Sequence, residues 1–108
     1  MFIEEKQISQ VLINLGKNAA QSLGKQENGL IKITTTTDTK GRKYIEVWDN
    51  GPGIPPELID EIFVPFFTTK NSGTGIGLSL SRQIMHLHGG NLSVRSVESD
   101  YTSFELSF

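Results

Sequence analysis

A heptapeptide at residues 49–55, Asp-Asn-Gly-Pro-Gly-Ile-Pro, constrains the fold of this chain more than any other stretch. The residues before it, 44–48, alternate and are rich in β-branched and aromatic side chains, which is typical of a β-strand. We therefore expect Asp49 where a strand opens into a loop, a common place for a binding site. Gly51 and Gly53 lack a Cβ, so the backbone can take a positive φ there or contact a flat ligand. Taken alone, the stretch also fits an ordinary tight turn capped by the aspartate.

Length and composition favour a single domain spanning residues 1–108. The formal net charge of −2 leaves no basic field, which argues against nucleic acid as a partner. The sequence contains no cysteine, so neither a disulfide framework nor a thiolate metal site is expected, as suits a reducing compartment. No apolar run reaches membrane-spanning length, and no signal pattern opens the chain. We expect a cytoplasmic domain that makes no membrane contact itself, even if a longer parent protein is membrane-anchored.

Apolar periodicity and turn signals predict the order of secondary structure. We expect helices over residues 2–23, 57–63 and 73–88, and strands over residues 30–37, 43–48, 91–97 and 102–108. The apolar side of the first helix comprises Ile8, Val11, Leu12, Leu15, Ala19 and Leu23. In the last helix the apolar residues are Ile76, Leu80, Ile84 and Leu87 on one line and Leu78 and Met85 on another. Both long helices are therefore expected to be well packed against a core.

The last predicted helix begins at a glycine-rich stretch, Gly-Thr-Gly-Ile-Gly at residues 73–77. A helix start carries partial positive charge and unpaired backbone N–H groups, so it can bind polyphosphate without a cationic side chain. The stretch is neither a Walker A loop nor a complete GxGxxG fingerprint. On the first helix, Asn14 and Asn18 lie one turn apart at the rim of the apolar side. They are either tolerated polar residues or a source of amide oxygens that suit Mg²⁺.

Four blocks in this order resemble the N, G1, F and G2 boxes of the ATP-binding domain of sensor histidine kinases. The blocks are residues 10–20, 49–55, 63–70 and 73–78, and together they span most of the chain. The wider family also holds DNA gyrase, MutL and the 90-kilodalton heat-shock chaperone. The resemblance implies a two-layer α/β sandwich, the Bergerat ATP-binding fold, in which helices cover one face of a mixed, mainly antiparallel sheet. It also implies ATP and Mg²⁺ as cofactors, with the nucleotide between the helices and a short polar lid.

The resemblance further implies a role for each residue that matches a box. Asp49 would accept a hydrogen bond from the exocyclic amine of adenine, Asn18 would bind Mg²⁺, and Lys70 would approach phosphate. The expected nucleotide-binding residues are Asn18, Asp49, Gly51, Gly53, Ile54, Phe66, Thr69, Lys70, Gly73, Thr74, Gly75, Ile76, Gly77, Leu78 and Thr102. Thr102 matches a threonine that shares a water with the adenine-reading aspartate, although Tyr101 stands where the family usually has glycine.

The fate of the γ-phosphate depends on Asn14. Family members that hydrolyse ATP carry a glutamate at this position to activate water, and an amide cannot accept that proton at neutral pH. We therefore expect phosphate transfer to a histidine and negligible hydrolysis, with Asn14 and Lys70 as the candidate catalytic residues. His86 and His88 are interpreted as structural, so the phosphoacceptor histidine is expected on a separate dimerisation domain of the same kinase. A response regulator would be an indirect partner.

Two other interpretations remain open from the sequence. One is a catalytically silent nucleotide-binding module that serves only in protein interaction or regulation. The other is an ATP hydrolase of the same family, against which Asn14 argues. An unrelated α/β domain is a third, less specific interpretation.

Overall fold

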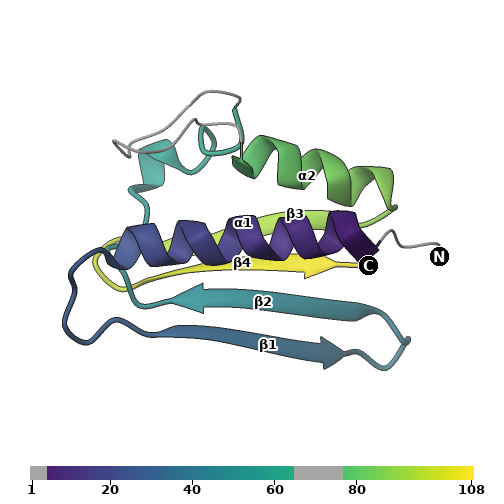
Figure 1. Cartoon of the computed structure of the whole chain (residues 1–108), viewed down its shortest axis with the longest axis horizontal. Helices are drawn as coiled ribbons and strands as arrows, with labels where there is room; N and C mark the ends of the chain where they lie inside the picture. Colours follow the sequence, from purple (N-terminus) through teal and green to yellow (C-terminus); the bar gives the residue numbers. More distant parts are fainter. Residues whose placement is uncertain (1–4, 65–76) are drawn as a thin grey trace.

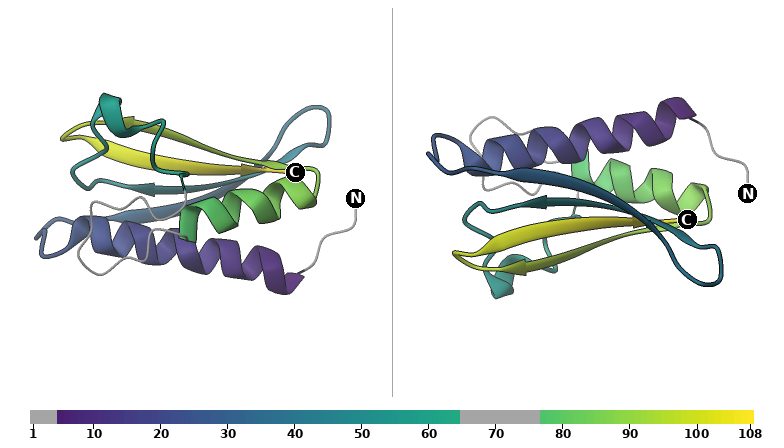
Figure 2. Two further views of the ribbon diagram at one scale, coloured as in Figure 1. Left: turned by 90° about the horizontal axis from the view of Figure 1, so that it is seen from above. Right: turned by 90° about the horizontal axis from the view of Figure 1, so that it is seen from below.

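A computed structural model describes residues 5–64 and 77–108 of the chain. Its elements are α1 (Glu5–Leu23), β1 (Ile31–Thr37), β2 (Lys43–Asp49), the 3₁₀ helix η1 (Pro56–Leu58), α2 (Gly77–Leu87), β3 (Asn91–Val97) and β4 (Tyr101–Ser107). Both α-helices lie on the same face of the sheet, which gives two layers (Figures 1 and 2). The element order agrees with the sequence prediction, apart from boundaries and the short helix considered below.

The sheet has the strand order β1-β2-β4-β3. Strands β1 and β2 form one hairpin, β3 and β4 form a second, and β4 pairs with β2 to join them. The predicted two-layer α/β sandwich is confirmed. The pairings among the described strands are all antiparallel, in agreement with the mainly antiparallel character that was predicted for a mixed sheet.

The core lies between this sheet and the two helices. Its buried apolar residues are Ile8, Val11, Leu15, Ala19, Val47, Ile84, Met85, Leu92, Phe104 and Leu106. The α1 members recur every three or four positions, so they line one side of that helix, as predicted. The strand members alternate with residues of the opposite face, because successive side chains of a strand point in opposite directions. Burial of this set is the main stabilising contribution to the fold.

The prediction for the last helix is wrong in detail. Leu80 and Leu87 were expected on a buried line, yet they are 45% and 74% exposed. The buried line of α2 is Ser81, Ile84 and Met85 instead. The reason is that α2 packs on α1 and β3 along a single side. Leu80 and Leu87 lie at the margin of that side, so their side chains remain in solvent.

The helix expected over residues 57–63 is also shorter than predicted. Only Pro56–Leu58 is helical, as a 3₁₀ turn. The backbone bonds that follow span three residues, from Glu61 N to Leu58 O and from Val64 N to Glu61 O. A segment of this length is too short to offset the cost of starting an α-helix, so tighter turns take its place.

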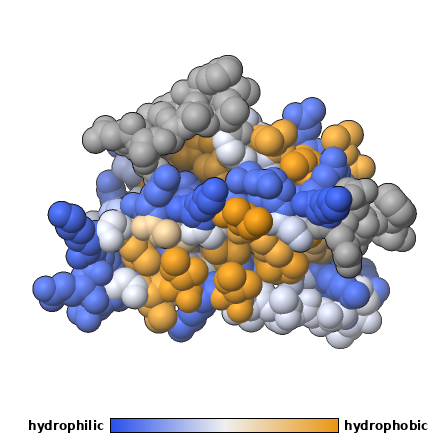
Figure 3. All heavy atoms as spheres, viewed as in Figure 1, coloured by the Kyte–Doolittle hydropathy of each residue, from blue (hydrophilic) through white to orange (hydrophobic). Residues whose placement is uncertain are grey.

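Strand β1 lies outside the cover of the helices. All seven of its residues are exposed, including Ile33 at 62%. Ile31 and Ile33 pair with the buried residues Asp49 and Val47, so they face the helix side of the sheet. Apolar side chains gather there, below α1, in Figure 3. We call the exposed residues Leu30, Ile31 and Ile33 the β1 apolar surface.

Candidate functional site

A row of paired residues crosses the sheet at the end of β2. Asp49 is the partner of Thr102 on β4, and Thr102 is the partner of Ser96 on β3. These side chains share the helix-facing side, because the buried Val47 and Phe104 lie two residues away on the same strands. Asp49 is 2% and Thr102 is 4% exposed. A carboxylate this deeply buried needs hydrogen-bond donors, and the backbone N–H of Gly51 donates to Asp49 Oδ1 at 2.9 Å.

The two glycines after Asp49 are required by close approaches within the loop. A Cβ on Gly51 would lie 2.7 Å from Asp49 Oδ1. Gly53 has a φ of 72°, and a Cβ there would overlap the carbonyl oxygen of Val97. Packing within the loop therefore requires glycine at both positions, independently of their predicted place in a binding site.

The β3–β4 hairpin holds this loop in place. The Ile54 N–H donates to Ser96 Oγ at 2.8 Å, and Ser99 N donates to Pro52 O at 2.6 Å. Ser96 Oγ in turn donates to Tyr101 O at 2.7 Å and lies 3.2 Å from Thr102 Oγ1. Sequence reasoning missed Ser96. The signal that could have found it is its place opposite Thr102 in a hairpin with a short polar turn.

Tyr101 occupies the usual glycine position without a strained backbone. Among the described residues other than glycine, a positive φ occurs only at Ser99. The Tyr101 ring stacks on Trp48 of β2, with 6.4 Å between ring centroids. The departure from the family pattern is therefore absorbed on the outer face of the sheet, and Thr102 keeps its place beside Asp49.

The asparagines of α1 lie between this row and α2. Asn14 Nδ2 donates to Ser81 Oγ on α2 at 3.3 Å, and Gln10 Nε2 donates to Asn14 Oδ1 at 3.1 Å. Asn18 is half-buried one turn further along α1. One more turn along, Ser22 Cβ would lie 3.5 Å from a Cβ on Gly51. The Asn18 turn is thus placed between the loop after β2 and the helix that begins at Gly77.

Several predicted site residues belong to a segment of which the structure gives no account. Phe66, Thr69, Lys70, Gly73, Thr74, Gly75 and Ile76 lie outside the described residues. Gly77 and Leu78 are described, and both are half-buried at the start of α2. Of the predicted site residues, the structure therefore places Asp49 beside Thr102, and Asn18 on the stretch of α1 between Asn14, which contacts α2, and Ser22, which approaches Gly51.

The described part of the chain offers no metal centre built from its own ionisable side chains, since no three of its His, Cys, Asp and Glu residues cluster. A neutral amide such as that of Asn18 fits a different kind of site, in which Mg²⁺ takes most of its ligands from phosphate and water. A shifted pKa is found away from this site. Backbone N–H groups of Arg42 and Lys40 lower the pKa of the Asp38 carboxyl in the β1–β2 turn.

The two histidines of the α2 region have local partners. His86 Nε2 lies 3.1 Å from Asn91 Oδ1, and His88 Nδ1 lies 2.8 Å from Ile84 O. These contacts fit the structural role predicted for both side chains.

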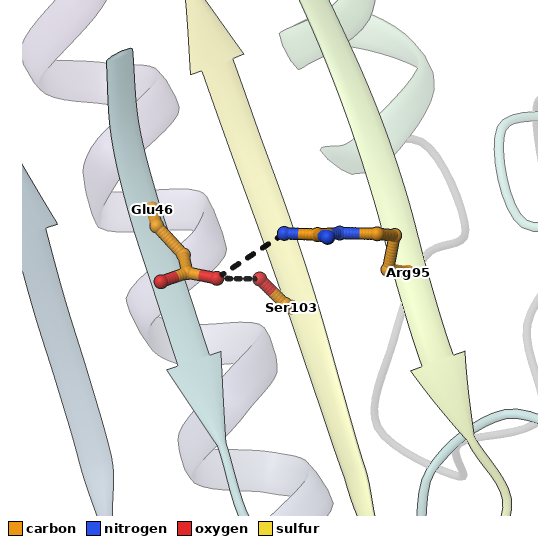
Figure 4. Close-up of polar contacts among 3 residues, drawn as sticks. All are labelled: Glu46, Arg95 and Ser103. Atoms are coloured by element: carbon orange, nitrogen blue, oxygen red, sulfur yellow. Dashed lines mark hydrogen bonds and ion pairs between the residues drawn. The ribbon is translucent and has the colours of Figure 1, made fainter. Parts of the chain in front are cut away.

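The outer face of the sheet carries a separate polar group. Ser103 donates to Glu46 Oε2 at 2.6 Å, and Arg95 lies 3.9 Å from the same oxygen (Figure 4). These residues lie on the side of the sheet opposite Asp49, so they are not part of the site. Within residues 5–64 and 77–108, no helix is long and apolar enough to cross a membrane.

This fold and site define a class of ATPase domain. The sequence model of the family described as histidine kinase-, DNA gyrase B-, and HSP90-like ATPase matches residues 3–108, and the chain belongs to that family. The resemblance stated from the four boxes is therefore confirmed.

Named relatives narrow the branch of this family. The chain is 40% identical over 105 residues to the sensory histidine kinase/phosphatase NtrB of Vibrio alginolyticus, covering 89% of this chain and 30% of that protein. It is 42% identical over 99 residues to the sensor histidine kinase ZraS of Escherichia coli, covering 92% of this chain and 21% of that protein. The chain thus spans less than a third of the length of these relatives.

Solved structures of histidine kinases have the same fold as this chain. The catalytic domain of histidine kinase ThkA superposes with a TM-score of 0.83 at 43% identity, covering 98% of this chain and 68% of that one. Full-length ShkA in complex with AMPPNP superposes with a TM-score of 0.82 at 28% identity, covering 94% of this chain and 21% of that one.

Proposed function

We propose that the chain binds MgATP and donates the γ-phosphate to a histidine on a separate dimerisation domain of a two-component sensor kinase, of which this chain is the catalytic domain. The observation that carries the proposal is the buried Asp49–Thr102 pair, held beside the glycine loop that follows β2. The sensor kinase names of the relatives and the AMPPNP complex of ShkA support it. A response regulator would then receive the phosphate from that histidine.

Asp49 reads the adenine in this proposal. A carboxylate offers only hydrogen-bond acceptors, so it matches the exocyclic amine of adenine and repels the carbonyl oxygen at the same position of guanine. One of its oxygens already accepts from Gly51 N–H, which fixes the orientation of the carboxylate. Gly51, Gly53 and Ile54 form the adjoining wall, on which the base would lie. Preference for ATP over GTP follows.

The phosphates lie at the start of α2. Gly77 and Leu78 there would present backbone N–H groups and the positive end of the helix dipole. Asn18 would supply one amide oxygen to Mg²⁺, which neutralises phosphate charge when bound. Phe66, Thr69, Lys70 and residues 73–76 remain proposed as further nucleotide-binding residues, with Lys70 as the cationic contact to phosphate.

Transfer is favoured over hydrolysis because the position of the family's water-activating glutamate is taken by Asn14. Its amide cannot accept a proton at neutral pH, and it already contacts Ser81 and Gln10. A histidine acceptor is itself a nucleophile, so Asn14 and Lys70 would need only to orient groups around the γ-phosphate. The competing candidates are a silent nucleotide-binding module and an ATP hydrolase.

Two measurements test the proposal. Calorimetric titration with MgATP and MgGTP should show binding of ATP and far weaker binding of GTP. Addition of a histidine-containing dimerisation domain from an NtrB-type kinase should then give acid-labile phosphohistidine on that domain from labelled ATP. Absence of ATP binding would refute the nucleotide site. Binding without transfer would favour the silent module, and steady release of phosphate by the chain alone would favour the hydrolase.

A further inference from the structure

We propose that Ser96 is a positioning residue that fixes which hydrogen-bonding groups Thr102 and Asp49 present to the purine. The inference rests on the proposed function, because it concerns how the same nucleotide is read. Ser96 lies on β3, does not match any of the four boxes, and joins three parts of the site: the loop after β2, the start of β4 and the Asp49 row.

The argument starts from the capacity of one hydroxyl group. A serine Oγ has a single proton to donate and lone pairs to accept with. The Ser96 proton is directed to Tyr101 O at 2.7 Å, and a lone pair accepts the Ile54 N–H at 2.8 Å. In the remaining contact, at 3.2 Å, Ser96 has no proton left, so Thr102 must be the donor.

This assignment determines what Thr102 can offer to a ligand. Once its proton is directed to Ser96, the Thr102 hydroxyl presents only lone pairs to its other neighbours. Its cross-strand partner Asp49 is a carboxylate and also presents only acceptors. The row therefore offers an acceptor-only surface, which fits a purine with an amine at position 6 better than one with a carbonyl oxygen there.

Ser96 also fixes the loop that adjoins this surface. Its bond to Ile54 N is formed across 42 residues of sequence and joins the loop after β2 to the β3–β4 hairpin. Loss of the hydroxyl would release Ile54 N and free the Thr102 proton to turn toward a ligand. The first effect weakens binding of any nucleotide, while the second specifically reduces the discrimination between amine and carbonyl.

The test compares ATP with inosine triphosphate, which carries a carbonyl oxygen in place of the amine. Affinities are measured by calorimetry in the whole chain for the wild type, Ser96→Ala, Ser96→Thr and Ser93→Ala. Ser93 is exposed and lies on the opposite face of β3, so it is the matched control. We expect Ser96→Ala to weaken ATP binding about three- to ten-fold, the effect of about one net hydrogen bond, because of the three contacts of Ser96 Oγ only the one from Ile54 N holds the loop on which the base would lie. The ratio of ATP to inosine triphosphate affinity should also narrow.

Ser96→Thr keeps a hydroxyl and should retain most of the wild-type ratio, and Ser93→Ala should leave both affinities unchanged. An unchanged ratio in a folded Ser96→Ala variant would overturn the inference, even if both affinities fell together, because a merely structural role predicts that result. If Ser96→Ala does not fold, the ratio of ATP to inosine triphosphate affinity is measured in Ser96→Cys, whose thiol is a weak donor. A narrowed ratio in that variant supports the inference, and an unchanged ratio overturns it. Failure of the wild type to bind ATP would instead refute the proposed function.

Discussion

Replacement of Asp49 by asparagine is the most direct test of the buried carboxylate. The substituted side chain would keep an oxygen for the Gly51 N–H, now 2.9 Å from Asp49 Oδ1, and would place an amide NH₂ where the second carboxylate oxygen stands. That amide faces the adenine amine donor to donor. A hydrogen bond to a charged group contributes roughly 1.5–3 kcal/mol, so loss of it should weaken ATP binding by about ten- to one-hundred-fold.

The assay is calorimetric titration of Asp49→Asn with MgATP and MgGTP. ATP affinity should fall, and the ratio of ATP to GTP affinity should fall further, since an amide can donate to the carbonyl oxygen of guanine. Asp100→Asn is the matched control, because that carboxylate is exposed in the β3–β4 turn. Thermal unfolding of each variant separates lost contacts from lost structure. A folded Asp49→Asn variant with wild-type ATP affinity would refute the adenine assignment.

Four further substitutions test other parts of the structure. Gly53→Ala should lower the free energy of unfolding by about 1–3 kcal/mol in chemical denaturation, because φ is 72° and the Val97 carbonyl occupies the place of the added Cβ. Gly16 lies in a helix with open space around its Cα, so Gly16→Ala should raise the free energy of unfolding by up to about 1 kcal/mol. Asn18→Leu should abolish the increase in ATP affinity that Mg²⁺ produces in the wild type, and a retained increase would remove Asn18 from the metal site. Asp38→Asn should destabilise the chain at neutral pH, because the pKa of Asp38 is lowered and its charge therefore stabilises the fold above the ordinary value of 3.8. The difference in free energy of unfolding between wild type and variant should shrink as pH falls through the folded pKa. A difference that does not depend on pH would contradict this reasoning.

The local sequence pattern was sufficient to predict those parts of the site whose structure depends on residues adjacent in sequence. The alternating run before Asp49 and the glycines after it predicted a strand that delivers a carboxylate to a loop, and the structure places it there. Strand boundaries were correct to within one residue because hydrophobic alternation and turn residues act over short distances.

The features that sequence missed depend on how distant elements pack. Ser96 is one of two serines in the alternating strand β3, and its role arises only from its register with Thr102 and its contact with Ile54. Leu80 and Leu87 match a helical period, but their exposure depends on which side of α2 meets α1 and β3. Periodicity specifies that a helix has an apolar side without specifying how wide the neighbouring layer is.

The β1 apolar surface has a consequence for handling the chain in solution. β1 is an edge strand of the described sheet, and its isoleucines are exposed beside a row of backbone groups that could pair with another strand. Colloidal behaviour should therefore depend on concentration, with light scattering rising as molecules meet edge to edge. Titrations at low protein concentration avoid mistaking the heat of that association for the heat of nucleotide binding.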